Sequence, residues 1–318
     1  MSVIVTAYNR REYLRYALAS LLNQDSDHFE TVLSKNFYDR YIDDLCSERG
    51  IRNVTTGSSG SGERVYDAIR SAGGDFILFL DDDDIFLRTK VSRVMEVLSA
   101  KAAGFYRNAI FPVTVDGVVA RSYQPLLPDP LYLVPRRGSD VFLLDRYNCS
   151  FNSSSMGISR ELLDSHASDL RKIDLAVDTF YFAVAASSGV PIFCDGRTES
   201  IYRIMPKSTS RDIRDFDSFV EFERSFLRRF VRDLERIHEI AEGSPAGPFL
   251  TRRLSLYRTL KYVFEGERPS GSPSIMDRIM FLSQRPFPFS ILYSRAFRKA
   301  AMRYEFRMEA EKIHGRGR

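Results

Sequence analysis

The stretch FILFLDDDD, residues 76–84, decides the fold class, because an apolar run leads directly into four consecutive aspartates. A short run rich in Phe, Ile and Leu is typical of a strand that is buried on both faces of a sheet. The aspartates Asp81–Asp84 then fall at the carboxyl end of that strand, which is the edge where α/β sheets bind ligands. Neighbouring carboxylates repel one another at neutral pH, so a bound cation would stabilise them. We therefore predict an α/β protein with a metal site at the end of a buried strand.

The cation that this arrangement favours is Mg²⁺ or Mn²⁺. Hard divalent ions prefer oxygen ligands and bridge protein carboxylates to the phosphates of a substrate. In an extended chain residues i and i+2 point the same way, so Asp81 and Asp83 would face one ion while Asp82 faces elsewhere. A solvated acidic loop would have the same sequence, and only the apolar strand before it argues for a site.

On both sides of this strand, residues 2–111 alternate short β-branched or apolar runs with helical patterns. That alternation indicates βαβ units and a mainly parallel sheet. The predicted strands are residues 3–6, 29–33, 51–55, 76–80 and 105–111. Further along we predict a hairpin over 113–119, a strand over 151–158, helices over 160–170 and 178–187, and a short strand over 191–194.

The first strand ends in a segment suited to a nucleotide. Thr6, Ala7 and Tyr8 would lie at its carboxyl end beside the acidic run, where the ring of Tyr8 could stack on a base. Asn9 is predicted to cap the following helix, with Glu12 completing a capping box. The free amides of such a helix end attract an anion. A plain turn between a strand and a helix would give the same pattern.

The composition excludes several classes of protein. Three cysteines, far apart and without CxxC spacing, exclude a disulfide scaffold and a structural zinc site, and favour a reducing compartment. Four histidines form no HExxH pair and no serine lies in a GxSxG elbow, so zinc-peptidase and serine-hydrolase chemistry lose their support. The hydrophobic fraction of 44% is that of an ordinary folded protein.

The carboxyl-terminal third differs from the rest, because predicted strands give way to helices rich in arginine and aromatic residues. Residues 216–318 hold 20 basic against 13 acidic residues, a net charge of +7. We therefore predict a catalytic domain over 1–215 and a basic helical extension over 216–318. The mixtures of aromatics and cations at 285–289 and 295–299 are typical of segments at a membrane interface, although an apolar stripe packed into a core is the plainer explanation.

The expected location is cytoplasmic, with peripheral attachment to the inner face of a membrane. The start lacks the basic and apolar regions of a secretory signal, and no apolar run approaches the roughly 20 residues that span a bilayer. Nucleic-acid binding is not expected, since no recognisable module accompanies the basic residues. A homodimer is a further expectation.

Residues 1 to about 205 resemble family 2 glycosyltransferases. The resemblance is carried by an opening block and an acidic block in the family's order and spacing, SVIVTAYNR at 2–10 and LDDDD at 80–84. It implies the GT-A fold, a Rossmann-like mixed α/β sheet flanked by helices. It also implies that the chain inverts an anomeric centre while moving a sugar from a nucleoside-diphosphate sugar to a sugar or lipid-linked acceptor.

The resemblance also assigns roles to individual residues. Asp81 and Asp83 would be the metal-binding DxD motif. The donor would contact Thr6, Ala7, Tyr8, Asn9, Glu12, Ser34, Arg64, Asp81 and Asp82. Among these, Ser34 stands where the family commonly has an acidic residue that contacts the base, and Arg64 lies near the place of a phosphate-binding arginine.

The family's general base is the Asp of a Glu-Asp pair that leads a helix, and only the Asp matches here. Asp178 is therefore the predicted base, with Asp174 as the alternative and a simple helix cap as the competing role. At a helix start the local dipole would hold this carboxylate ionised. Two other functions stay open: a sugar nucleotidyltransferase, which would release pyrophosphate, and a non-catalytic nucleotide-binding module.

Overall fold

The computed structural model describes residues 1–114, 117, 119, 129–205, 215–265, 275, 279 and 295–313. Its strands are β1 (Ser2–Ala7), β2 (Glu30–Lys35), β3 (Arg52–Thr55), β4 (Phe76–Asp81), β5 (Ile85–Phe86), β6 (Phe105–Thr114), β7 (Leu131–Leu133), β8 (Met156–Ser159) and β9 (Ile192–Ile204). Its helices are α1 (Leu14–Leu22), α2 (Arg40–Glu48), α3 (Ser61–Ser71), α4 (Lys90–Ala100), α5 (Gly138–Asp145), α6 (Arg160–Ser165), α7 (Ala167–Leu170), α8 (Val177–Ser187), α9 (Phe216–Ile240), α10 (Gly247–Glu265) and α12 (Arg295–Ile313), with a 3₁₀ turn η2 (Ser153–Ser155).

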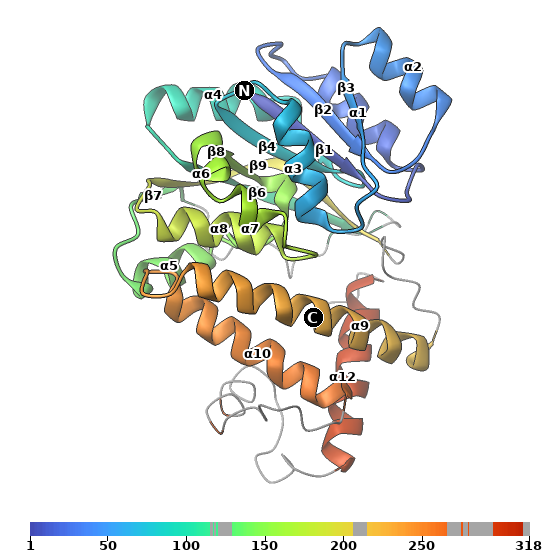
Figure 1. Ribbon diagram of the computed structural model, residues 1–318, viewed down its shortest axis with the longest axis vertical. Helices are drawn as coiled ribbons and strands as arrows, with labels where there is room; N and C mark the ends of the chain where they lie inside the picture. Colours follow the sequence, from blue (N-terminus) through green and yellow to red (C-terminus); the bar gives the residue numbers. More distant parts are fainter. Residues whose placement is uncertain are drawn as a thin grey trace.

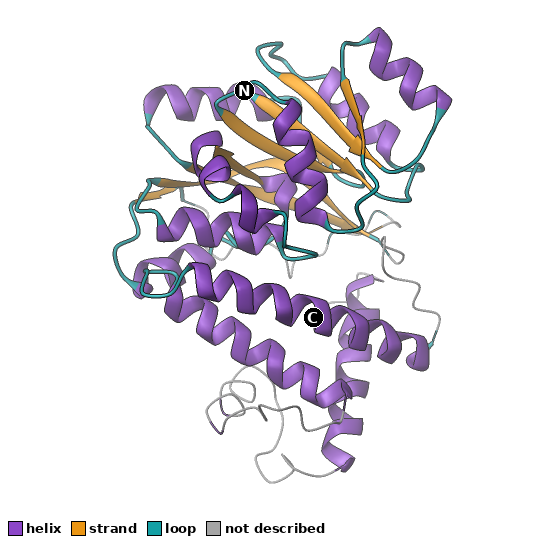
Figure 2. Ribbon diagram, in the orientation of Figure 1, coloured by secondary structure: helices purple, strands orange, loops and turns teal. Residues whose placement is uncertain are grey.

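The described strands form one mixed sheet in the order β3-β2-β1-β4-β8-β6-β9-β5, with β7 also paired to β9 (Figures 1 and 2). Strands β1 to β4 are parallel to their neighbours in this group, as the βαβ pattern predicts. The order changes at β8, which is antiparallel to both β4 and β6. A mixed α/β sheet flanked by helices confirms the predicted fold class.

Alternate residues of the central strands point to opposite faces of the sheet and so bury two cores. Ile4 and Phe79 belong to the core that includes α3, α6 and α8. Val5 and Leu80, their neighbours in sequence, belong to the core that includes α1, α2 and α4. The apolar run of β4 is therefore buried on both sides, which is why it lacks polar alternation.

The helix after β1 begins later than the sequence predicts. It starts at Leu14, and Tyr13 at the capping position makes no side-chain cap. Asn9 has a φ of 56°, in the left-handed region, and its side-chain oxygen accepts from Nδ2 of Asn36 at 2.8 Å. The predicted Asn9 cap is wrong because this side chain is bound to a neighbouring strand end. The capping box with Glu12, which is exposed, does not form.

Three predicted elements in the second half need correction. Of the strand predicted over 151–158 only β8 is extended, preceded by η2. The helix predicted over 160–170 is broken at His166 into α6 and α7. The short strand at 191–194 is the first part of β9, which continues to Ile204 alongside β6.

The hairpin predicted over 113–119 is described only in part. An antiparallel bridge joins Val113 to Val119, and Asp116 of the predicted turn lies outside the described residues.

The described part of the extension after residue 215 consists mainly of the helices α9, α10 and α12, with a turn between α9 and α10. Helices α9 and α10 add Leu234 and Phe249, among others, to the core beneath α8. A smaller core joins α9, α10 and α12. The apolar stripe of α9 is therefore packed against the sheet domain (Figure 1).

Membrane contact was predicted for two segments of the extension. Residues 285–289 lie outside the described part of the chain, and the side chains of 295–298 are likewise not described. Within the described residues, no helix has the length and apolar character needed to cross a membrane.

Candidate active site

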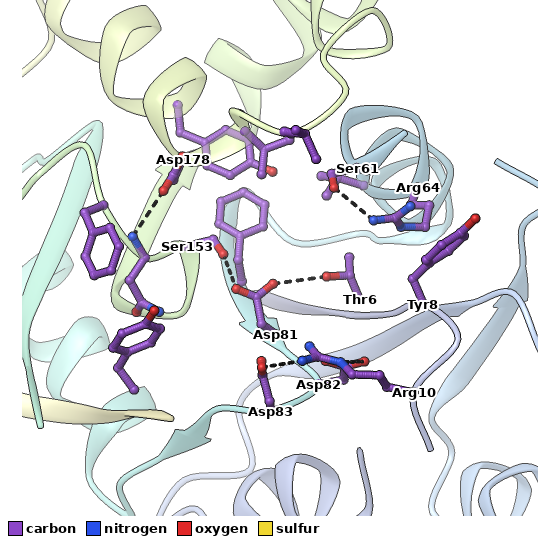
Figure 3. Close-up of a pocket in the computed structure, with 18 residues that line it drawn as sticks. Thr6, Tyr8, Arg10, Ser61, Arg64, Asp81, Asp82, Asp83, Ser153 and Asp178 are labelled. Carbon is purple, nitrogen blue, oxygen red and sulfur yellow. Dashed lines mark hydrogen bonds and ion pairs between the residues drawn. The ribbon is translucent and has the colours of Figure 1, made fainter. Parts of the chain in front are cut away.

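A cavity of about 300 Å³ opens where the carboxyl ends of β1 and β4 meet the start of α8 (Figure 3). It brings together seven of the predicted site residues: Thr6, Tyr8, Arg64, Asp81, Asp82, Asp83 and Asp178. These residues come from four elements or the turns beside them, so only folding makes them neighbours. In Figure 3, Asp178 lies to one side of Asp81 and Arg64 to the other.

Asp81 is the last residue of β4 and lies directly beside Thr6 in the parallel ladder. Thr6 Oγ1 donates to Oδ1 of Asp81 at 3.3 Å, and Ser153 Oγ donates to Oδ2 at 2.6 Å. Burial, and then the charge of Asp83, raise the pKa of Asp81 above its ordinary value. This carboxylate is thus held in place at the sheet edge, where a cation would lower its free energy.

The chain turns immediately after Asp81, since the amide of Asp84 donates to the carbonyl of Asp81 at 3.1 Å. The extended backbone on which the alternation of carboxylates was predicted therefore ends at Asp81. Instead, Asp82 and Asp83 share one partner: Arg10 donates to Asp83 Oδ2 at 2.6 Å and pairs with both oxygens of Asp82. Arg10 is a site residue that the sequence did not reveal.

The fourth aspartate is structural. Asp84 is buried and accepts from Asn152 Nδ2 at 2.8 Å and from the amide of Arg203 at 2.9 Å. Burial raises its pKa well above the ordinary value. Asp84 thereby ties the acidic turn to β9 and to the loop before β8.

Tyr8 and Arg64 form one wall of the cavity. The guanidinium carbon of Arg64 lies 4.5 Å from the centre of the Tyr8 ring, which is a cation–π contact. Arg64 also donates to the Ser59 carbonyl at 2.6 Å and to Ser61 Oγ at 2.9 Å, while its buried Nε has no partner among the described residues. A cation with an unused donor beside an aromatic ring suits a nucleotide phosphate and base.

Asp178 occupies the second position of α8, on the opposite wall. Its Oδ1 accepts from the Thr179 amide at 2.7 Å and its Oδ2 from the Asn152 amide at 3.3 Å. Burial raises the pKa of Asp178, and this outweighs the lowering by the charge of Arg253 and by these amides. Burial is therefore a larger influence on this carboxylate than the amides at the helix start, and the proton affinity of Asp178 is higher than that of an exposed aspartate.

Asp174, the alternative base, does not line the cavity. Arg229 donates to both of its oxygens, at 2.6 and 2.7 Å, and Arg232 adds a contact at 3.2 Å. The hydrogen bonds from Arg229 hold the pKa of Asp174 below its usual value. A carboxylate paired in this way is a structural anchor and a poor proton acceptor.

The segment that carries Asp178 is fixed by a carboxylate of the extension. Asp233 of α9 is fully buried and accepts from the amides of Asp174, Leu175 and Ala176, at 2.7–3.2 Å. These amides belong to the three residues immediately before α8, so Asp233 fixes the segment that leads into that helix. The signal was present in the sequence as an acidic residue inside the apolar stripe of α9.

Four residues that were predicted to contact the sugar donor do not line the cavity. Ala7 is buried within β1, and Asn9 is exposed and paired with Asn36. Glu12 is exposed before α1. Ser34 is fully buried within β2, which extends two residues beyond the predicted end at Leu33.

The loop before β8 supplies the contacts that sequence reasoning missed. Asn152, with a φ of 65°, and Ser153 both line the cavity. Asn152 binds Asp84 through its side chain and Asp178 through its amide, so it links the two halves of the site. The available signal was the run of small polar residues at 152–155, which fell within the strand predicted over 151–158.

The carboxylates at this site suit a hard divalent cation whose remaining ligands come from a substrate. Asp81 and Asp83 supply carboxylate oxygens at a buried sheet edge, where burial and mutual repulsion raise the pKa of Asp81. No described group of three or more His, Cys, Asp or Glu side chains is arranged to hold an ion alone. Mg²⁺ commonly binds through one or two carboxylates together with substrate phosphates, so two ligands from the protein fit it.

A comparison with family models matches residues 2–166 to "Glycosyl transferase family 2". Among curated proteins, the chain is 34% identical over 110 residues to an uncharacterized glycosyltransferase of Haemophilus influenzae. That alignment covers 31% of this chain and 34% of the relative, so the chain spans about a third of the length of that protein.

Solved structures share the fold at low identity. S. aureus TarS 1–349 in complex with UDP-GlcNAc has a TM-score of 0.56 and 18% identity, over 89% of this chain and 78% of that one. The Pyrobaculum calidifontis mannosyltransferase PcManGT, in complex with GDP-Man and Mn²⁺, has a TM-score of 0.55 and 14% identity, over 99% and 85%. These likenesses confirm the predicted GT-A type of sheet.

Proposed function

Because the chain belongs to glycosyl transferase family 2, we propose that it moves a sugar from a nucleoside-diphosphate sugar to an acceptor hydroxyl with inversion at the anomeric carbon. The observation that carries this proposal is that one cavity is lined both by Asp81, at the end of β4, and by Asp178, at the start of α8. One carboxylate lies where a metal and diphosphate would bind, and the other lies across the space that a sugar would fill.

The donor side of the cavity would hold the nucleotide. The ring of Tyr8 offers a stacking surface and Arg64 an unused donor for a phosphate oxygen. Asp81 and Asp83 would hold Mg²⁺ or Mn²⁺, which supplies charge neutralisation of the leaving diphosphate when bound. The structures of two neighbours with UDP-GlcNAc and with GDP-Man and Mn²⁺ support this class of donor.

The acceptor side would use Asp178 as general base. Among the described residues its Oδ2 accepts only from the Asn152 amide, at 3.3 Å, so this is the oxygen that would accept a proton from an acceptor hydroxyl. A raised pKa increases the proton affinity of a carboxylate and so favours this role. Proton removal by Asp178 and departure of the diphosphate from the side of Asp81 would occur in a single in-line displacement, which inverts the sugar carbon.

The division of labour along the chain is part of the proposal. Residues 1–215 would form the catalytic domain, and residues 216–318 an extension that buttresses the segment of Asp178 through Asp233. Attachment to the cytoplasmic face of a membrane and a homodimer remain predictions from the sequence.

The test is nucleotide binding by calorimetry, with UDP, GDP and dTDP, each with and without Mn²⁺. We expect one nucleotide to bind, and to bind more tightly with the ion. Incubation with the matching nucleotide sugar should then release the nucleoside diphosphate. Release of pyrophosphate would instead identify a nucleotidyltransferase, and absence of metal-dependent binding to any nucleotide would refute the proposal.

A further inference from the structure

A second cavity, of about 430 Å³, lies between α5 and the first half of α10. Three arginines line it: Arg146 after α5, and Arg252 and Arg253 on α10. Among the described residues, none of the three has a carboxylate within ion-pair distance. Like charges gathered in a concave surface repel one another and attract an anion.

The single acidic residue of this cavity is already bound. Asp145 Oδ1 accepts from Ser150 Oγ at 2.8 Å, and that hydroxyl in turn accepts from Arg253 Nη1 at 2.8 Å. The Nε of Arg253 is buried and has no partner among the described residues. A buried guanidinium donor without an acceptor is costly, and an anionic ligand would satisfy it.

The remaining walls are aromatic. Arg252 lies over the Phe142 ring at 5.8 Å, and Arg253 lies over Phe249 at 5.8 Å and Tyr257 at 6.0 Å. These contacts hold the guanidinium groups against flat apolar surfaces without neutralising them. Cations beside ring faces suit a ligand that joins a phosphate to a sugar or polyol, because the phosphate meets the arginines and the C–H faces meet the rings.

This cavity is connected to the active site through one short loop. Arg253 holds Ser150, and two residues further on the amide of Asn152 donates to Asp178. The positive charge of Arg253 also lowers the pKa of Asp178, against the dominant effect of burial. A group bound to Arg253 would therefore lie close to the loop and helix start that hold the proposed base.

We propose that the cavity between α5 and α10 is an acceptor subsite that binds a phosphate group of the acceptor. The assignment rests on the proposed function, since it takes Asp178 as the base that the acceptor hydroxyl must reach. It gives the helical extension a second role besides buttressing, because two of the three arginines come from α10. The phosphate belongs either to the acceptor glycan or to a lipid that carries it.

The test is calorimetric titration of the full chain with inorganic phosphate, in EDTA and at constant ionic strength. Arg252→Gln removes an exposed cation and cannot unfold the protein through burial, and Arg253→Gln removes the cation nearest Asp178. The matched control is Arg258→Gln, one turn or more further along α10, where Arg258 pairs with Glu235 outside the cavity. We expect the phosphate dissociation constant to rise about tenfold in the first two variants and to stay unchanged in the control.

Equal phosphate binding by the wild type and all three variants would overturn the proposal, as would absence of binding by the wild type. Flotation with vesicles containing phosphatidylglycerol separates the two sources. Loss of flotation in Arg252→Gln assigns the phosphate to a lipid carrier, and unchanged flotation assigns it to the glycan. Metal-dependent nucleotide binding is measured on the same proteins. If nucleotide binding is absent while phosphate binds, the proposed function and the acceptor role both fail; if nucleotide binds and phosphate does not, only the subsite fails.

Discussion

Arg10 donates from Nη1 to Oδ2 of Asp83 at 2.6 Å, so the second carboxylate of the expected metal pair already has a cationic partner. The same guanidinium contacts both oxygens of Asp82. Arg10 follows Asn9, whose left-handed backbone is held by reciprocal hydrogen bonds with Asn36. The turn after β1 thus aims a positive charge at the acidic turn after β4.

Replacing Arg10 by Ala should strengthen the binding of Mn²⁺ in the absence of a nucleotide. The ion would no longer compete with the guanidinium for Asp83, and loss of this partly exposed pair is worth about 1 kcal/mol, or roughly a fivefold change in affinity. Titration of free Mn²⁺ by electron paramagnetic resonance measures this. Arg11→Ala is the control, because the Arg11 guanidinium lies over the Phe37 ring and forms no ion pair with a carboxylate among the described residues. Weaker binding by Arg10→Ala would show that Arg10 supports the site.

Asp83→Ala and Asp178→Asn should separate binding from chemistry. The first should abolish the metal-dependent part of nucleotide binding, because it removes an oxygen ligand. The second should leave nucleotide binding unchanged and lower turnover by about 10²–10⁴, the usual contribution of a general base. Calorimetry and release of nucleoside diphosphate provide the two measurements. An Asp178→Asn protein with wild-type turnover would remove Asp178 from the mechanism.

The pH dependence of turnover should reflect the raised pKa of Asp178. The base must be ionised, so activity should fall as the pH drops through that pKa, and the acid limb should lie above the usual value for aspartate, 3.8. Burial is the cause, because it disfavours the charged form. The measurement is turnover at a saturating concentration of the sugar donor between pH 4 and pH 8, with about five points per pH unit around the fall in rate. A rate that stays level down to pH 4 contradicts the assignment.

Replacing Asp233 by Ala should destabilise the protein and impair catalysis together. Several buried amides before α8 would lose their acceptor, at a cost of about 1–3 kcal/mol or more in the free energy of unfolding. Asp233→Asn keeps one acceptor oxygen and should lose less. Urea unfolding measures stability, and Glu239→Ala, an exposed site on the same helix, should change it by less than about 0.5 kcal/mol. Equal stability of the Asp233 and Glu239 variants would contradict the role of Asp233 in fixing the segment before α8.

Lys90 should give the unfolding free energy a distinct pH dependence. It is fully buried, contacts Asn108 and lies over the rings of Phe86 and Tyr106. Burial lowers the pKa of Lys90 from 10.5 to about 7. Between these two values the unfolded chain binds a proton that the native protein does not, so stability rises with pH.

The rise should approach about 1.4 kcal/mol per pH unit and should be absent from Lys90→Met. Urea unfolding of both proteins at pH 7, 8 and 9 gives the slope of the free energy of unfolding against pH for each. Roughly equal slopes would contradict the prediction. Glu199 and Asp195 lie near this lysine and act on its pKa in the opposite direction to burial, as both raise it. They are present in both proteins, so the difference between slopes isolates Lys90.

The sequence by itself determined the parallel half of the sheet and the position of the acidic turn. These follow from local rules: an apolar run such as 76–80 has to be buried on both faces, and the residue after it has to lie at the sheet edge. Thr6, Tyr8 and the aspartates 81–83 met in one cavity for this reason, whereas Arg64 and Asp178 were brought there by helices. The family resemblance, carried by residues 2–10 and 80–84, was confirmed by the match to residues 2–166.

Only the tertiary structure decided which charges meet. Three contacts each join residues more than 50 positions apart: Arg10 with Asp83, Arg229 with Asp174, and Asp233 with the amides before α8. No local pattern encodes such a pair, because the energy of a charge depends on its burial and on partners that other elements bring to it. That is also why Asp174 and Asp178, four residues apart and alike in sequence, came to differ in their proton affinity.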